Sequence, residues 1–284
     1  MNLCLVHRDR RGAMARIEPE FDAIRRCGVS LITCNADALD ATTRGTILDQ
    51  LAAALGERGR VRVLLHSIAF GNLKLVAPEK SRPNHARQAL AAALGIDETQ
   101  LAERVDALFE QGVDALQHLA SAPIYSDTQF LDEEDLARTI HSMGTSVLGW
   151  TQALHGRGLF AADARVFGLT SEGNQVAWKG YAAVAAAKVA LESVVRAIAV
   201  ELAPYGIRAN VIQAGVTDTP ALRAIPGNAH LKAQARLRNP FGRITTPQDV
   251  ANVIYLLARD EAAWINGEII RVDGGEHVSG VTLQ

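Results

Sequence analysis

Residues 165–213 read RVFGLTSEGNQVAWKGYAAVAAAKVALESVVRAIAVELAPYGIRANVIQ and contain the clearest pattern of alternating strand and helix in the chain. The stretch opens on an apolar run, Arg165–Thr170, which predicts a buried strand. An Ala-rich helical pattern follows over Tyr181–Leu202, and a second apolar run, Ile207–Gln213, predicts another strand. Strand, helix and strand in this order indicate a parallel sheet that is covered by helices.

The same alternation runs along the rest of the chain. Further strands are expected at Leu3–His7, Val29–Cys34, Val61–His66 and Glu268–Val272, and further helices at Met14–Arg26, Thr42–Leu55, Asp132–Leu154 and Pro247–Ala258. We therefore expect an α/β fold with a doubly wound parallel sheet.

Composition narrows the classes of protein that fit. The 284 residues are 48% apolar and suffice for one large α/β domain or two small ones. The formal net charge of −2 gives no electrostatic case for binding nucleic acid or an anionic membrane. No apolar run is long enough to span a bilayer, and no metal-binding cluster is visible. The 3 cysteines have no redox spacing, which suits a reducing cytosol.

Tyr181 and Lys188 lie seven residues apart on the long predicted helix. A helix turns about 100° per residue, so a step of seven returns to nearly the same face. The phenol and the ammonium group can therefore project into one site. A Tyr with a free pKa of about 10 needs a neighbouring cation to act as a proton donor or oxyanion partner at neutral pH. The alternative is a core Tyr at a helix start and a solvated Lys.

Residues 71–126 depart from the strand–helix alternation. Residues 71–84 read as a loop, and a helical apolar stripe follows. The stripe consists of Leu101, Val105, Leu108, Phe109, Leu116 and Leu119. We favour a surface helix packed on the domain. The alternative is a lid beside the substrate mouth, because loops that leave the carboxyl ends of strands line the ligand crevice of such sheets.

Four segments resemble the short-chain dehydrogenase/reductase superfamily and, within it, the enoyl-acyl-carrier-protein reductases. They are HSIAF (66–70) after a strand, the six-residue gap between Tyr181 and Lys188, NVIQAGVTDTPAL (210–222), and FGRITTPQDVANVIYLLA (241–258) followed by INGEIIRVDGG (265–275). The resemblance covers most of the chain outside 71–126. It implies one Rossmann-like reductase domain, residues 1–284, with a helical insertion at about 71–126.

The resemblance implies NAD(P)H-dependent reduction of the 2,3 double bond of an enoyl thioester, carried by acyl carrier protein or coenzyme A. By position, Tyr181 would hydrogen-bond the thioester carbonyl, and Lys188 would hold the nicotinamide ribose and favour the reactive state of Tyr181. Enoyl reductases often carry a second Tyr ten residues before the first, but Ser171 stands there. Ser171, or Thr170 beside it, would then hold the substrate carbonyl. Alternatively, both hydroxyls cap a turn.

The resemblance also implies a set of cofactor-binding residues at strand ends. They are Arg8, Asn35, Ala36, Ser67, Ile68, Ala69, Lys188, Gly215, Thr217 and Thr219. A basic cluster at residues 7–11 follows the first strand, where NADP-users place Arg, and it favours NADPH over NADH. The alternative is a solvated basic turn. His66 is expected to be a strand-end residue with a satisfied hydrogen bond rather than a general base.

A Gly-rich turn that binds pyrophosphate at a helix N-terminus follows no strand in this sequence. Against the resemblance, Leu3–His7 aligns with the second strand of the family, after a strand–loop–helix unit of about 30 residues. The absent strand would lie in the middle of the sheet, so unpaired ladder groups are expected on its neighbours. We expect a start codon assigned too far downstream; a natural variant without the loop is the alternative.

Three functions are therefore open from the sequence. The first is an enoyl reductase of fatty-acid or related biosynthesis. The second is a carbonyl or hydroxyl oxidoreductase of the same superfamily, which Ser171 supports and the six-residue gap opposes. The third is a non-catalytic binding partner, supported by the missing Gly-rich turn. The resemblance further implies a homo-oligomer, a tetramer; the small residues Ala182, Ala183, Ala186 and Ala190 would permit close helix packing or burial against the sheet.

Overall fold

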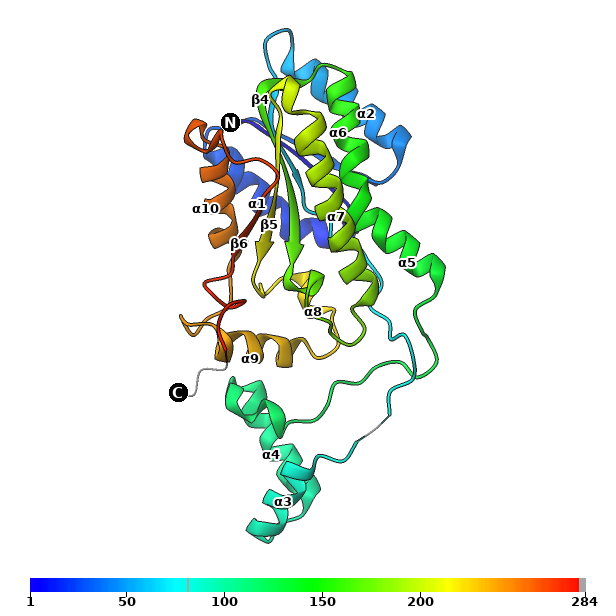
Figure 1. Ribbon diagram of the computed structural model, residues 1–284, viewed down its shortest axis with the longest axis vertical. Helices are drawn as coiled ribbons and strands as arrows, with labels where there is room; N and C mark the ends of the chain where they lie inside the picture. The colour runs from blue at the N-terminus through cyan, green and yellow to red at the C-terminus, as the bar shows by residue number, and fades with distance from the viewer. Residues whose placement is uncertain (81, 281–284) are drawn as a thin grey trace.

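The computed structural model describes residues 1–80 and 82–280 as parallel strands with covering helices (Figure 1). The strands are β1 (Leu3–His7), β2 (Leu31–Asn35), β3 (Val61–His66), β4 (Phe160–Ser171), β5 (Arg208–Ala214) and β6 (Ile269–Val272). All of their pairings are parallel. The parallel α/β fold that the sequence predicts is confirmed, although β4 begins at Phe160 rather than Arg165.

The helices stand between the strands in chain order. They are α1 (Arg11–Arg26), α2 (Ala41–Leu55), α3 (His85–Leu94), α4 (Glu98–Glu110), α5 (Glu133–Thr139), α6 (Ser146–Gly156), α7 (Ala182–Glu201), α8 (Pro220–Arg223), α9 (Asn228–Arg238) and α10 (Pro247–Leu257). Short turns of 3₁₀-helix are η1 (Asp114–His118), η3 (Glu172–Asn174), η4 (Ala203–Tyr205) and η5 (Asp260–Ala262), and a π-helix, η2 (Ile140–Thr145), joins α5 to α6. No helix in the described ranges combines the length and hydropathy needed to cross a bilayer.

Polar N-cap residues fix where several helices begin. The side chains that accept a backbone N–H in the first turn of α2, α3, α4 and α5 belong to Asp40, Asn84, Asp97 and Asp132. Thr246 opens α10 with a capping box that Asp249 completes. Such caps satisfy N–H groups that have no partner within the helix. The predicted start of α10 agrees with its cap.

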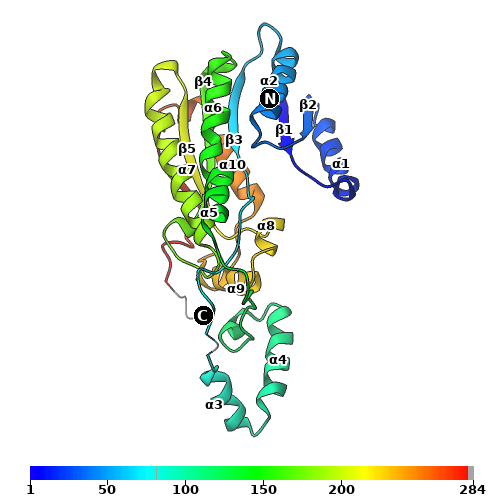
Figure 2. The same cartoon turned by 90° about the vertical axis from the view of Figure 1, so that its right-hand side faces the viewer.

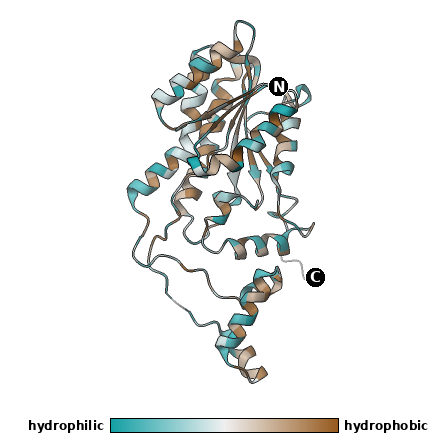
Figure 3. Ribbon diagram, turned by 180° about the vertical axis from the view of Figure 1, so that it is seen from behind, coloured by the Kyte–Doolittle hydropathy of each residue, from teal (hydrophilic) through white to brown (hydrophobic). Residues whose placement is uncertain are grey.

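Apolar residues on both faces of the sheet build the core. On β4, Val166 and Phe167 are both fully buried, and they lie in different clusters. Successive side chains of a strand point to opposite faces. Val166 packs with Leu191 of α7 and Val147 of α6, whereas Phe167 packs with Val250 of α10. Helices α6 and α7 therefore cover one face and α10 the other (Figure 1), and hydrophobic residues concentrate on the strands (Figure 3).

Hydrogen bonding divides the strands into two sheets. Strands β1 and β2 form one pair, and β3, β4, β5 and β6 form a four-stranded sheet in that order. Figure 2 shows β1, β2 and α1 set to one side of β3. Within the described residues, the outer edges of β1 and β3 carry no strand pairing. The unpaired ladder groups that the sequence predicts at this position are therefore present.

The predicted insertion leaves the body on two extended segments and carries α3 and α4 beyond α9 (Figures 1 and 2). Leu101, Val105 and Phe109 of the apolar stripe are buried, in one cluster with Ala91 of α3 and Ala233 of α9. Leu116 and Leu119 join this cluster at its margin, but Leu108 is 45% exposed. The stripe therefore packs on α3 and α9. Ser81 of this stretch lies outside the described residues.

Candidate active site

The candidate site lies at the carboxyl ends of β3, β4 and β5, where parallel strands bring their following loops to one edge. Ser171 is the last residue of β4, and turn η3 follows it. Tyr181 stands at the N-cap of α7, and Lys188 lies within that helix. The ring of Trp178 packs edge-on against Tyr181, with 5.3 Å between the ring centroids. The strand–helix unit that decides the fold thus also assembles the predicted catalytic residues.

Tyr181 and Ser171 meet at the end of β4. The Oη atom of Tyr181 is 3.4 Å from Oγ of Ser171. Burial raises the pKa of Tyr181 above its ordinary value, and the hydrogen bond with Ser171 opposes that rise. Tyr181 is therefore a neutral phenol at neutral pH, able to donate its proton. Gly173 permits this arrangement, because a Cβ at that position would overlap Cε1 of Tyr181.

Lys188 is buried, with an exposed fraction of 7%. Its Nζ atom donates a hydrogen bond to the carbonyl oxygen of Leu169, at 2.8 Å. Burial lowers the pKa of Lys188 to about 8, and the negative charge of Glu192 opposes this fall. The alternative prediction of a solvated Lys is therefore wrong, because the packing of α7 on β4 places the side chain in the interior.

The neighbouring hydroxyls of Thr170 and Ser171 have different partners. Oγ1 of Thr170 donates to Oε1 of Glu192 at 2.6 Å and is buried. Ser171 makes no capping hydrogen bond to turn η3. The turn-capping alternative is therefore wrong for Ser171, and Ser171 is the hydroxyl that faces Tyr181.

A buried ionic cluster that the sequence analysis missed holds turn η3 from the other side. Nη2 of Arg238, on α9, lies 2.5 Å from Oε2 of Glu172 and 3.1 Å from Oε1 of Glu276. The ring of His277 lies 3.3 Å from Oε1 of Glu172. Burial raises the pKa of Glu276, and Arg238 opposes the rise. These contacts join segments far apart in the chain, so no local sequence pattern could have indicated them.

The loop after β5 is closely packed. A Cβ at Gly215 would lie 2.5 Å from Oγ1 of Thr245 and 2.8 Å from Oε2 of Glu276, so only glycine fits without displacement. Oγ1 of Thr217 donates to the carbonyl oxygen of Gly215 at 3.0 Å. Oγ1 of Thr219 accepts the backbone N–H of Leu222, in the first turn of α8, at 3.1 Å. Three of the predicted cofactor-contacting residues, Gly215, Thr217 and Thr219, thus lie on the one loop after β5. Thr219 also caps α8.

The segment after β3 is largely exposed to solvent, whereas His66, the last residue of β3, is buried. Ser67 and Ala69 are exposed and Ile68 is half-buried. Nε2 of His66 lies 2.7 Å from Oγ of Ser146, and that hydroxyl already donates to a carbonyl of the preceding turn. His66 is therefore the donor in this pair, and burial lowers its pKa to about 4. The predicted role of His66 as a hydrogen-bonded strand-end residue is confirmed.

The ends of β1 and β2 contribute Arg8, Asn35 and Ala36. The guanidinium of Arg8 lies 4.5 Å from the ring centroid of Phe70, which brings the carboxyl end of β1 toward the segment after β3. Arg8 also pairs with Asp37 at 2.9 Å. The side-chain amide of Asn35 exchanges hydrogen bonds of 2.9 and 3.0 Å with the backbone of Asp9. Asp37 is an acid at this position that the sequence analysis overlooked.

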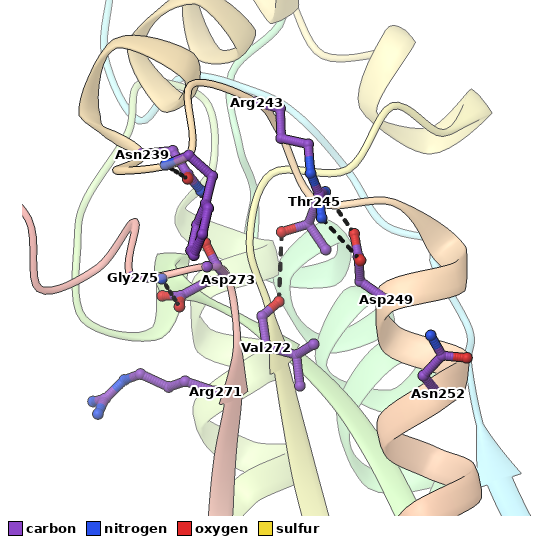
Figure 4. Close-up of a pocket in the computed structure, with 11 residues that line it drawn as sticks. Asn239, Arg243, Thr245, Asp249, Asn252, Arg271, Val272, Asp273 and Gly275 are labelled. Carbon is purple, nitrogen blue, oxygen red and sulfur yellow. Dashed lines mark hydrogen bonds and ion pairs between the residues drawn. The ribbon is translucent and has the colours of Figure 1, made fainter.

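A hollow of about 410 Å³ lies apart from these residues, between the end of β6 and the start of α10 (Figure 4). Arg243 and Asp249 on its wall form two hydrogen bonds, at 2.7 and 3.1 Å. None of the predicted site residues lines the hollow. The side chains at the strand ends, rather than this hollow, therefore form the candidate site.

The residues at the strand ends fit the nicotinamide end of a dinucleotide. An ammonium group has three N–H donors, and in the described structure Nζ of Lys188 has one acceptor, the carbonyl of Leu169. The others are available to ribose hydroxyls.

A family model described as Enoyl-(Acyl carrier protein) reductase matches residues 96–277, more than half of the chain. The chain belongs to the enoyl-(acyl carrier protein) reductase family. It therefore lies within the short-chain dehydrogenase/reductase superfamily, as the resemblance implies.

Relatives of this reductase-family protein include enzymes of two chemistries. It is 41% identical over 101 residues to enoyl-acyl-carrier-protein reductase (NADH) FabI of Aquifex aeolicus, covering 36% of this chain and 37% of that protein. It is 33% identical over 120 residues to cis-4-hydroxycyclohexanecarboxylate dehydrogenase of Sinomonas cyclohexanicum, covering 42% and 45%. The matched stretches therefore span less than half the length of either relative.

A solved structure supports the fold over the whole chain. The Bacillus cereus enoyl-acyl carrier protein reductase with NADP⁺ and indole naphthyridinone superposes with a TM-score of 0.71, at 18% identity. The superposition covers 99% of this chain and 87% of that one. The Rossmann-like fold that the resemblance implies is confirmed.

Proposed function

We propose that this family member reduces the 2,3 double bond of an enoyl thioester with NADPH or NADH. One observation carries the proposal. Tyr181 and Lys188 have the six-residue gap of the enoyl reductases and share the end of β4, where Oη of Tyr181 lies 3.4 Å from Oγ of Ser171. The family match supports the reaction class, and the gap supports this branch of it.

The chain's side chains supply the electrostatic part of such a reaction. Reduction at the β-carbon of an enoyl thioester moves negative charge to the thioester oxygen, where a positioned donor has most effect. The hydroxyls of Tyr181 and Ser171 would donate to that oxygen. Lys188 would hold the ribose hydroxyls. A bound reduced nicotinamide would supply the hydride, and a proton delivered to the α-carbon would complete the reduction.

The partners follow from the same proposal. An acyl thioester, on acyl carrier protein or coenzyme A, is the substrate. A homo-oligomer stays a prediction from the family resemblance.

A second candidate, a carbonyl or hydroxyl oxidoreductase, is favoured by one observation. Ser171 replaces the second Tyr of many enoyl reductases, and its hydroxyl faces Tyr181. A Ser–Tyr pair of this kind would hold a ketone oxygen as readily as a thioester oxygen. The relative that acts on a hydroxycyclohexanecarboxylate keeps this candidate open.

A substrate comparison separates the two candidates. The oxidation of NADPH and NADH is followed with crotonyl-coenzyme A and crotonyl-acyl carrier protein, and with a panel of ketones and 3-oxoacyl thioesters. We expect turnover with the crotonyl thioesters. Turnover only with ketones would assign the second candidate. If fluorescence titration detects no binding of either nucleotide, both enzyme proposals fail for this chain, and the non-catalytic binding partner is the hypothesis left.

The choice of cofactor is tested at Arg8 and Asp37. A guanidinium favours the 2′-phosphate of NADPH, whereas a carboxylate accepts from the free ribose hydroxyls of NADH. Because Arg8 is the predicted phosphate partner, we expect Arg8→Gln to weaken NADPH binding more than NADH binding. Arg16→Gln, an exposed Arg on α1, is the control. An equal effect of Arg8→Gln on both nucleotides would remove Arg8 from cofactor selection.

A further inference from the structure

A buried carboxylate lies beside the proposed catalytic pair. Glu192 follows Lys188 by one helical turn on α7, so both side chains lie on the same face of the helix. Glu192 is 7% exposed, and it has no ion pair within 4.0 Å in the described structure. A carboxylate without a cation in contact is costly to bury, so its neutral hydrogen-bond donors must hold it.

Two hydrogen-bond donors, one before and one after Ser171 in the chain, hold this carboxylate. Oε1 of Glu192 accepts from Oγ1 of Thr170 at 2.6 Å and from Nδ2 of Asn174 at 2.7 Å. Asn174 turns its amide nitrogen to Glu192, and its own Oδ1 is buried with no hydrogen-bond partner among the described residues. This orientation indicates that the carboxylate determines the position of Asn174, rather than the reverse.

Close packing of α7 on β4 makes these contacts possible. A Cβ at Gly168 would lie 3.1 Å from side-chain atoms of Leu191, so the glycine lets the helix approach the strand. Lys188 and Glu192 flank Leu191 and reach successive residues of β4, namely Leu169 and Thr170. The strand end that carries the next residue, Ser171, is thereby attached to α7 at two points.

We propose that Glu192 is a positioning residue of the Tyr181–Lys188 site, whose buried carboxylate fixes the end of β4 and turn η3 against α7 and serves as the acidic partner of Lys188. The proposal rests on the proposed function for its catalytic meaning only. Its first part follows from the contacts to Thr170 and Asn174. Its second part follows from the shared helix face of Glu192 and Lys188.

The charge of Glu192 has a definite effect on Lys188. Among the described residues, the charge of Glu192 acts on Lys188 from the same helix, and Lys188 acts on His66 at the end of β3; Tyr181 stands two turns before Lys188, at the start of α7. His66 and Tyr181 are uncharged at neutral pH, so Glu192 is the charged one. Removing its charge should lower the pKa of Lys188 further below about 8, because burial then acts unopposed.

Glu192→Gln removes the charge and keeps the shape, so it tests the proposal directly. Lysine side chains labelled with ¹³C at Cε are titrated by NMR in the full chain, and Lys188→Met assigns the signal. We expect a lower titration midpoint for Lys188 in Glu192→Gln and an unchanged one in Glu201→Gln, an exposed Glu on the same helix. An unchanged midpoint in Glu192→Gln would overturn the proposed charge partnership.

Kinetics test the same variant in the reaction. The alkaline limb of kcat against pH should move to lower pH in Glu192→Gln, with about a tenfold loss of rate on that limb per unit of displacement. The KM for the nucleotide should change far less than kcat. A pH profile that overlays that of Glu201→Gln would contradict the proposal. If the NMR midpoint moves but no substrate is turned over, the proposed function fails and the charge partnership stands.

Thr170→Val keeps the proposal testable if Glu192→Gln does not fold. It removes one donor to the carboxylate, preserves side-chain volume and leaves the charge in place. We expect kcat to fall about 2- to 10-fold, the range for one hydrogen bond, with the Lys188 midpoint not lowered. A wild-type kcat in Thr170→Val would overturn the role of Glu192 in fixing the strand end.

Discussion

Lys188 is buried, and burial disfavours the charged form of its ammonium group. The side chain is 7% exposed, and its pKa is lowered to about 8, so it stays protonated at neutral pH with little margin. Tyr181 is shifted in the opposite direction, toward the neutral phenol. Neutral donor and buried cation are the protonation states that a carbonyl-polarising site requires. The chemistry therefore depends on the environment of a few side chains, whichever substrate is bound.

Loss of the Tyr181 hydroxyl should disable this site. We expect Tyr181→Phe to lower kcat by about 10²- to 10⁴-fold, because the variant cannot donate to the substrate oxygen. The free energy of unfolding should change little, since the hydrogen bond that is lost in the described structure is the long, 3.4 Å contact with Ser171. Steady-state kinetics measure the effect, with the substrate that the panel of crotonyl thioesters and ketones identifies. Tyr255→Phe, which changes an exposed Tyr on α10, is the control. An undiminished kcat would remove Tyr181 from the mechanism.

His66 should make the fold acid-sensitive. Its pKa is lowered from 6.5 to about 4 by burial, so between these values the unfolded chain binds more protons than the folded one. The free energy of unfolding should therefore fall as the pH drops through this window, by up to about 3 kcal/mol. Chemical denaturation at several pH values measures it.

The non-titrating variant His66→Gln isolates this contribution. Its free energy of unfolding should fall less steeply between pH 6.5 and 4 than that of the wild type. His85→Gln, at an exposed position that begins α3, should keep the wild-type slope. Equal slopes in all three proteins would contradict the buried, neutral state of His66.

Among the helices and strands, the sequence predicts those whose apolar residues recur with a regular period within one short segment. The alternation of strands and helices is readable because each element buries one apolar face. Helix α9 (NAHLKAQARLR) was not predicted, because charged residues interrupt its apolar pattern. Glu192 was within reach of the same reasoning that found Lys188, since it stands one turn further along the helix. The pairing of Arg238 with Glu172 was not, because α9 and η3 are adjacent only after folding.

The insertion is attached to the body through α9. Asp114 of η1 makes two hydrogen bonds of 2.5 Å with Arg236 of α9, beside the apolar cluster around Phe109. Helix α9 in turn holds turn η3 through Arg238. The insertion is therefore coupled by contact to the segment next to the site, and the alternative role as a lid stays untested.

Breaking this attachment should loosen the insertion selectively. We expect Asp114→Asn to reduce the hydrogen-exchange protection of α4 and η1 by about fivefold or more, which corresponds to roughly 1 kcal/mol, the net contribution of a hydrogen bond. Strands β4 and β5 should be unaffected. Glu134→Gln breaks an exposed ion pair with Arg138 and is the control. Equal loss of protection in the insertion and the sheet would show that the two unfold together.

In the molecule as a whole, β1 and β3 do not pair with each other, so the strands fall into a two-stranded and a four-stranded sheet. Strands β4 and β5 are paired on both edges and buried on both faces, whereas β1 and β2 form a pair on their own. Val6 of β1 nevertheless shares an apolar cluster with Leu48 of α2 and Trp150 of α6. The β1–β2 unit is therefore held to the body mainly by side-chain packing.

Hydrogen exchange should resolve these two units. Amides of β1 and β2 should exchange through openings of lower free energy than those of β4 and β5, because fewer buried contacts hold them. Exchange measured by mass spectrometry across a denaturant series separates the two free energies. Coincident values for all strands would mean that the two sheets open as one cooperative unit.

Reduction of an enoyl thioester at the Tyr181–Lys188 site can be followed by the transfer of the hydride itself. The most direct measurement follows the deuterium of 4-deuterated NADPH, in both stereochemical forms, into the product of crotonyl-coenzyme A. We expect label at the β-carbon of butyryl-coenzyme A with one of the two forms, and loss of product formation in Tyr181→Phe but not in Tyr255→Phe. Deuterium on a carbinol carbon of a ketone substrate, with no labelled butyryl thioester, would contradict it.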